Sequence, residues 1–204
     1  MTEACPKGRA RGAAFLTPIV LVAAFFLLRP LVVRGTAPPE IAAVSTWFQG
    51  RELRVFARLS SSFPVELEKR LASGLPTTVV WQIGLFRFRE MFWDNKRDER
   101  RYAVTATYRP LTGDFVLERR LDDRLLETRV VPARPEAVRA LTEVPSLPAF
   151  LLGEHLAGKQ LLVKVRCAFE AGVALGVVPK TIETDWMPSS VFTWERRPGG
   201  PDGP

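Results

Sequence analysis

Apolar and polar residues alternate along most of the chain after residue 40, and this period of two is typical of strands that bury one face. The first alternating run spans residues 53–60 and follows residues 41–49 across a turn that contains Gly50. Two such runs on either side of a glycine-containing turn predict a β-hairpin at the start of the folded body.

The same period predicts further strands at residues 77–89, 101–108, 115–120, 125–131 and 160–169, an extended segment at 145–152, and one or two final strands within 182–194. The first of these changes its apolar face at Gly84, which predicts a bulge or a bend there. We expect irregular structure at residues 172–179.

Two segments have the pattern of a helix. In the first, Leu67 and Leu71 lie about one turn apart, and Pro64 suits the first helical position. Gly74 can end this helix because glycine tolerates positive φ. The second is a short helix at residues 135–141.

About eight strands joined mostly by short turns, with two short helices, favour a mainly β fold. We expect an antiparallel β-sandwich-like, or α+β, domain. A parallel α/β fold is disfavoured because it needs helices between most of its strands.

The N-terminal segment has the pattern of a membrane-directed helix. Three basic residues within 7–11 precede an uncharged run at 12–28, which the apolar residues 31–33 extend. This length suffices to cross a bilayer, and a basic flank is retained in the cytoplasm. We therefore expect one transmembrane or signal helix at residues 13–33, single-pass in the inner membrane with the N-terminus cytoplasmic.

This helix divides the chain into three parts. Residues 1–36 form a cytoplasmic basic region and a signal anchor or signal peptide, residues 37–195 form a periplasmic β-rich domain, and residues 196–204 form a disordered tail rich in Pro and Gly. Cleavage after Ala37 would instead release the domain into the periplasm. Pro38 follows immediately and disfavours cleavage, so an uncleaved anchor is favoured.

The positive charge of the chain is concentrated at its ends. The 204 residues include 29 Lys and Arg against 22 Asp and Glu, which gives a net charge of +7 and a pI near 10. Residues 1–34 hold +4 of this charge and the tail holds +1, so residues 35–195 hold only +2. Nucleic-acid binding needs Lys and Arg concentrated on a folded face, and this distribution therefore argues against it.

The inventory of reactive residues indicates that the protein is not an enzyme. His155 is the single histidine, so a second histidine for a zinc site is lacking, and no nucleophile motif accompanies it. Asp122 and Asp123 lie between arginines that neutralise them, which disfavours a metal site. We expect no catalytic, cofactor-binding or metal-ligating residue.

The two cysteines are not expected to pair. Cys5 precedes the membrane segment and stays cytoplasmic, whereas Cys167 lies on the apolar side of the strand at 160–169. The second thiol is therefore predicted to be buried and inert. An intermolecular disulfide or a reactive thiol is the alternative.

Residues 86–94 interleave aromatic and basic side chains. Such a segment can stack on nucleic-acid bases or bind an anionic lipid. Alternatively, an edge or two-sided strand buries its aromatic residues and leaves its arginines in solvent. The candidate ligand or partner surface consists of Trp81, Phe86, Arg87, Phe88, Arg89 and Trp93.

Five segments of the chain form an ordered set, at residues 63–76, 86–94 (FRFREMFWD), 101–108, 161–166 and 185–194 (DWMPSSVFTW). Over about residues 41–194 the set resembles a bacterial family, domain-of-unknown-function family 4390, although residues 163–176 depart from its pattern. The resemblance implies an exported or membrane-anchored protein of Gram-negative bacteria. It implies no established activity and assigns no catalytic residues.

Together these patterns predict a membrane-anchored periplasmic protein that acts as a non-enzymatic protein-interaction module of the bacterial envelope. The expected partners are the inner membrane, through residues 13–33, and another envelope protein. We expect no nucleic acid, no small-molecule substrate and no cofactor. The alternative is a periplasmic carrier or sensor of an apolar ligand or lipid, held between sheet and helix near Trp81, Phe86, Phe88 and Trp93.

Overall fold

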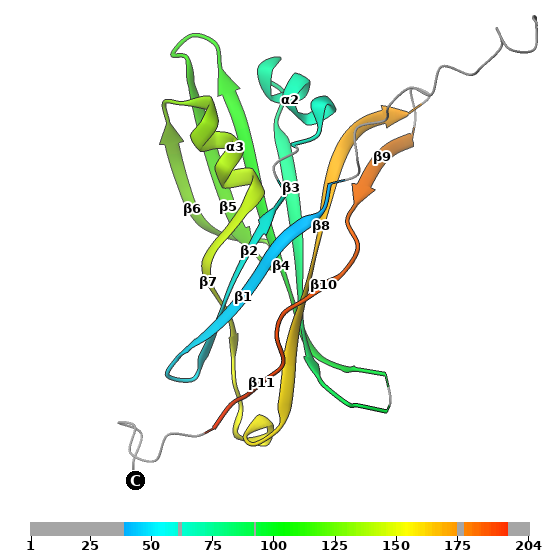
Figure 1. Cartoon of the computed structure of the whole chain (residues 1–204). Coiled ribbons are helices and arrows are strands. Elements are labelled where there is room, and N and C mark those ends of the chain that lie inside the picture. The colour runs from blue at the N-terminus through cyan, green and yellow to red at the C-terminus, as the bar shows by residue number, and fades with distance from the viewer. Residues whose placement is uncertain (1–38, 61–62, 92, 175–177, 196–204) are drawn as a thin grey trace, which may run out of the picture. The chain divides into compact units, whose positions relative to one another are not determined.

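Figure 1 shows a computed structural model of the chain, which describes residues 39–60, 63–91, 93–174 and 178–195. The chain divides into two compact units, Met1–Thr36 and Ala37–Pro204, and the described residues all belong to the second. Among them, no helix is long and apolar enough to span a bilayer. The segment predicted to do so, residues 13–33, lies outside the described residues, as does the predicted tail at 196–204.

Three strands form the smaller sheet, sheet A: β1 (Ile41–Gln49), β2 (Glu52–Leu59) and β7 (Glu143–Leu151), in the order β1-β2-β7. β1 and β2 form the predicted antiparallel hairpin. β7 comes much later in the chain and pairs antiparallel with the other side of β2. β1 and β7 are therefore the two edges of sheet A.

The larger sheet, sheet B, has the order β10-β8-β3-β4-β5-β6, and β9 and β11 also pair with β8. All of these pairs are antiparallel. Its strands are β3 (Thr77–Arg87), β4 (Asn95–Arg109), β5 (Asp114–Leu121), β6 (Arg124–Val131), β8 (Gln160–Ala174), β9 (Val178–Glu183), β10 (Met187–Pro188) and β11 (Phe192–Thr193).

The described residues contain two α-helices and one short 3-10 turn: α2 (Val65–Ala72), α3 (Arg134–Thr142) and η1 (Glu154–Leu156). Leu67 and Leu71 of α2 are fully buried, as their spacing predicts. Just after α2, Gly74 adopts a φ of +77°, as expected of a residue that ends a helix. Pro64 is the N-cap and not the first helical residue.

Sheets A and B enclose one hydrophobic core, and in Figure 1 sheet A crosses in front of sheet B. Alternate residues of β2, β3, β4 and β8 are buried in this core, so the period of two in the sequence corresponds to the inner faces of the strands. Helix α3 adds Ala137 and Leu141. The prediction of a mainly β, antiparallel domain with two short helices is confirmed.

Several strand ends differ from the prediction. β4 begins at Asn95, six residues before the expected start, because its polar first residues pair with the end of β3, where Arg87 lies opposite Asn95. Residues 172–179 were expected to be irregular, but β8 continues to Ala174 and pairs with β9 from Val178 onward. Backbone hydrogen bonds define these ends, and they do not require alternation of side chains.

The irregularity of β3 lies one residue beyond Gly84, between Leu85 and Phe86, where the register with β4 shifts. The Phe86 ring folds back over Gly84, so that a Cβ added at Gly84 would lie 2.6 Å from a ring carbon. Trp186 packs against the same ring in an edge-on arrangement, with 6.4 Å between the two ring centroids. Gly84 is therefore required by the position of this ring.

We predict that Gly84→Ala lowers the free energy of unfolding by about 1–3 kcal/mol, the usual cost of overpacking. Urea denaturation followed by tryptophan fluorescence measures this loss. In a Phe86→Ala background the ring is gone, so the same Gly84→Ala change should cost less than half as much. An equal cost in both backgrounds would show that the ring does not impose the glycine.

Candidate binding site

The structure does not bring the six predicted surface residues onto one face. Trp81 is fully buried in the core, whereas Phe86, an odd number of residues later, lies on the opposite face of sheet B. Arg87 and Phe88 are half-buried, Arg89 is exposed, and Trp93 is 95% exposed beyond the end of the strand. A single aromatic and basic surface therefore does not form.

Phe86 instead belongs to a small cluster on the outer face of sheet B. Lys164 lies over the Phe86 ring at 5.1 Å, and Arg166 lies over the Trp186 ring at 4.9 Å. Both cations also have carboxylate partners: Lys164 lies 2.7 Å from Asp94, and Arg166 lies 3.3 Å from Glu183. The charges of this cluster are already neutralised, so it offers little to a charged ligand.

The edges of the two sheets differ in how they are protected. The β1 edge of sheet A lies beside β8 and β10 of sheet B, so the two sheets meet along this edge. β7 carries Pro145 and Pro148, which lack backbone N–H groups, and its Ala149 carbonyl accepts a hydrogen bond from Arg100 Nε at 3.1 Å. Such features hinder the addition of another strand.

β6 lacks that protection. Among the described residues it is paired on one side only, by β5, and its eight residues contain neither proline nor glycine. Leu125, Leu126 and Val130 are about half exposed, at 51%, 48% and 50%. Unpaired backbone groups together with exposed apolar side chains make an edge strand a template for another chain.

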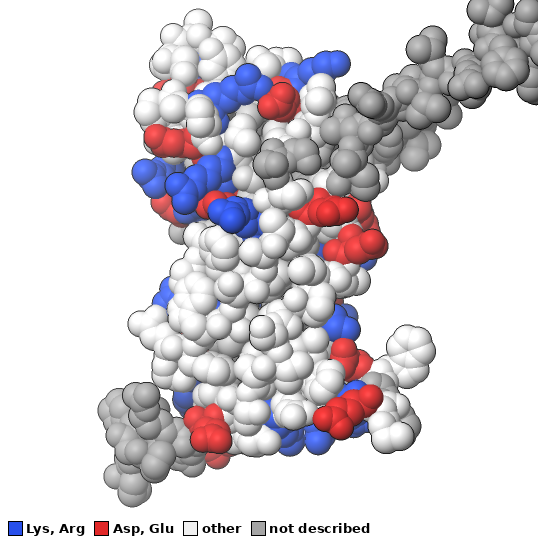
Figure 2. Space-filling view, viewed as in Figure 1, with Lys and Arg blue, Asp and Glu red and all other residues white. Residues whose placement is uncertain are grey.

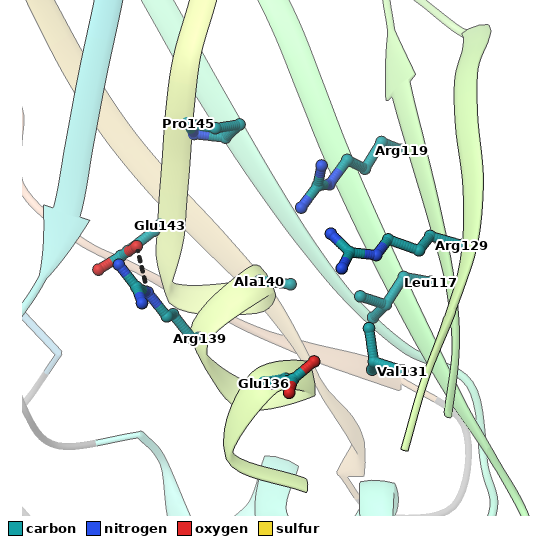
Figure 3. A pocket seen from close by; sticks show the side chains of 9 residues that line it. All are labelled: Leu117, Arg119, Arg129, Val131, Glu136, Arg139, Ala140, Glu143 and Pro145. Carbon is teal, nitrogen blue, oxygen red and sulfur yellow. Dashed lines mark hydrogen bonds and ion pairs between the residues drawn. The ribbon is translucent and has the colours of Figure 1, made fainter. Parts of the chain in front are cut away.

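A hollow of about 170 Å³ lies beside β6. The inner faces of β5 and β6 form one side of it, the strand wall, and α3 with the start of β7 forms the opposite side, the helix wall. Figure 3 shows Arg119 and Arg129 projecting from the strands toward α3. Figure 2 shows acidic and basic side chains together around α3, whereas the middle of the same face is largely uncharged. The lining residues are Leu117, Arg119, Arg129, Val131, Glu136, Arg139, Ala140, Glu143 and Pro145.

Two of the three arginines in the hollow have ion-pair partners. Arg119 lies 2.8 Å from Glu127, and Arg139 lies 2.9 Å from Glu143. Within the part of the chain that the structure describes, Arg129 on the strand wall and Glu136 on the helix wall have no ion pair. Arg119 Nε is buried without an acceptor. The strand wall therefore carries donors that lack acceptors.

Tyr102 adds a further donor next to this wall. It lies opposite Leu121 on the adjacent strand, diagonal to Arg119, and its buried hydroxyl has no hydrogen-bond partner. Burial raises the pKa of Tyr102 to about 12, while the Arg119 charge lowers it and the Glu127 charge raises it. These residues were not among the predicted site residues, although Arg119 shares the inward-facing positions of β5 with Leu117 and so interrupts an apolar face.

The other candidate residues lie elsewhere. Asp122 and Asp123, both at positive φ, form the turn between β5 and β6. Their partners are Arg100 and Arg101 of β4, not the neighbouring arginines that the sequence indicated. Among the described side chains, no group of three His, Cys, Asp or Glu residues could hold a metal ion.

His155 and Cys167 lie in different environments. His155 is exposed in the 3-10 turn η1. Cys167 is fully buried on the inner face of β8, and burial raises the pKa of its thiol. The prediction of a buried thiol is confirmed, and its environment disfavours the reactive thiolate.

Comparisons with known proteins find one family. The model described as "Domain of unknown function (DUF4390)" matches residues 37–195, a range that contains every strand and helix described above. No curated protein and no solved structure matches the chain. The chemistry of the site therefore rests on its own side chains.

We predict that Tyr102→Phe does not destabilise the protein at pH 7, because it removes a buried hydroxyl that has no partner. At high pH the Tyr102→Phe substitution should stabilise the folded protein relative to the wild type. The folded-state pKa of about 12 lies above the value of about 10 for an unfolded tyrosine. The wild type therefore loses stability as pH rises from about 10 to 12, by roughly 1 kcal/mol at pH 11.

Urea denaturation of wild type and Tyr102→Phe at pH 8 and pH 11 checks both statements. The difference in unfolding free energy should grow with pH in favour of the variant. Parallel losses in the two proteins would contradict the burial of an unpartnered hydroxyl.

Proposed function

The chain belongs to the family described as Domain of unknown function (DUF4390), and from its edge strands we propose that it is a non-enzymatic protein-interaction module of the bacterial envelope. The module binds an extended segment of an envelope partner as an additional strand beside β6. The observation that carries this proposal is the unprotected edge of β6, in contrast to the proline-bearing edge of β7.

Strand addition suits the dimensions and chemistry of β6. Eight residues at about 3.3 Å each give a docking length of about 26 Å. Main-chain hydrogen bonds supply affinity in this mode of recognition, and alternate side chains supply specificity. The half-exposed Leu125, Leu126 and Val130 provide apolar contacts for such side chains.

The charges of β6 favour a different protein over a second copy of the chain. Arg124 and Arg129 have no ion pair in the described part of the structure, and Glu127 is engaged by Arg119. Pairing of two β6 strands would bring these like-charged arginines to one interface, which is unfavourable. An acidic partner segment would neutralise them.

The envelope location rests on the N-terminal pattern. In this proposal residues 13–33 anchor the chain in the inner membrane, with the N-terminus cytoplasmic and residues 37–195 in the periplasm. The basic residues within 7–11 and the uncharged run that follows them support this orientation. Cleavage after Ala37, with release of the domain, is the alternative.

Alkaline phosphatase fused after residue 40 tests the orientation, because the enzyme is active only after export. We predict an active fusion that remains in the membrane pellet after carbonate extraction. An inactive fusion would contradict the orientation. Activity in the soluble periplasmic fraction would show that the segment is cleaved.

A photo-crosslinking residue at Thr128 of β6 tests the docking edge in living cells. We predict one defined adduct that is absent when the same residue replaces Thr193, an exposed threonine of β11. Arg129→Glu should reduce the adduct at least fivefold, because it reverses the charge of the edge. Arg97→Glu, which changes an exposed arginine that has no ion pair among the described residues, should leave it intact.

Two outcomes would contradict the proposal. An adduct of twice 22.8 kDa containing only this chain would show that a second copy occupies the edge. Equal adducts from Thr128 and Thr193, or an adduct insensitive to Arg129→Glu, would show that β6 is not the docking strand.

A further inference from the structure

We infer that the hollow beside β6 receives a carboxylate of the bound segment, and that Arg129 and Arg119 bind it. This inference rests on the proposed function and names the chemistry of the partner: an extended segment with a carboxylate at one inward-facing position. The carboxylate belongs either to an Asp or Glu side chain or to a chain terminus, and both would use the same donors.

The register of sheet B places Arg129 at the mouth of the hollow. Arg129 lies opposite Leu117 of β5, and Leu117 is buried on the inner face of the sheet. A strand added beside β6 would place its own inward-facing side chain opposite Arg129, at about 5 Å between Cβ atoms. That side chain therefore enters the hollow.

The strand wall offers donors that match a carboxylate. The Arg129 guanidinium has no ion pair in the described structure, and Arg119 uses one terminal nitrogen for Glu127 while its buried Nε has no acceptor. Arginine binds carboxylates through charge-assisted, often bidentate hydrogen bonds.

The helix wall restricts where the carboxylate lies. Glu136 lines the opposite side of the hollow and has no ion pair among the described residues. Its negative charge repels a ligand carboxylate, which therefore lies against the strand wall near Arg129 and Arg119. Removal of this charge should strengthen the binding of an acidic segment, an effect opposite in sign to the loss of either arginine.

Binding of short capped peptides to the full chain in detergent micelles tests the inference. The probes are Ac-Thr-Val-Glu-Val-Thr-NH₂, the same peptide with Gln in place of Glu, and a truncated pair, Ac-Thr-Val-OH and Ac-Thr-Val-NH₂. Amide chemical shifts of β6 residues report the site, and their titration gives the dissociation constants. The Glu and Gln pair tests a side-chain carboxylate, and the truncated pair tests a terminal one.

We expect the acidic member of at least one pair to bind about tenfold more tightly than its neutral counterpart. Arg129→Gln should remove this preference, and Arg119→Gln should reduce it. Glu136→Gln should increase it, and Arg97→Gln, the matched control on an exposed arginine, should leave it unchanged. Because Arg129 is exposed, its variant is expected to fold, and far-UV circular dichroism checks this.

The possible failures are distinguishable. Equal binding of acidic and neutral peptides at β6, or a preference that survives Arg129→Gln, overturns the carboxylate site and leaves strand addition standing. An acidic preference without shifts in β6 contradicts strand addition itself. Absence of binding by all four peptides overturns the inference, while the cross-linking experiment still decides the proposed function.

Discussion

β3 is hydrogen-bonded along both edges, to β4 and β8, and its inner side chains fill the space beneath sheet A. Val79, Trp81, Ile83 and Leu85 are at most 2% exposed. Burial of each large apolar side chain contributes about 1.5–3 kcal/mol. The packing of this face holds the two sheets together, and the positions of the other strands follow from pairing outward from β3.

Sheet B has two edges, one on the β8 side and one at β6, and they differ in how they are covered. On the β8 side, short strands and the neighbouring β1 cover the edge. On the β6 side, the inner face carries Arg119 and Arg129 where the core would need apolar residues, and α3 leaves a hollow in front of them. The unpartnered donors and the unprotected edge are thus neighbours, and the proposed binding of an acidic segment uses both.

The parts of the fold that depend on local patterns could be predicted from the sequence. The first hairpin, the helix that stops near Gly74 and the buried Cys167 follow from alternation, spacing and turn chemistry. The early start of β4 at Asn95 could not be predicted, because it depends on pairing with the distant end of β3. The residues of the candidate surface around Phe86 lie on two faces of sheet B. The aromatic pattern of this segment does not distinguish Trp81, which packs in the core, from Phe86, which packs against Trp186.

Amide hydrogen exchange along β6 measures whether this edge is open to another strand. In the full chain without a partner, the β6 amides that point away from β5 should exchange much faster than the amides of β3, which is paired on both sides. Addition of the acidic peptide should slow those same amides and leave β3 unchanged. Protection of β6 equal to that of β3 before any ligand is added would show that the edge is already covered, which contradicts strand addition at β6.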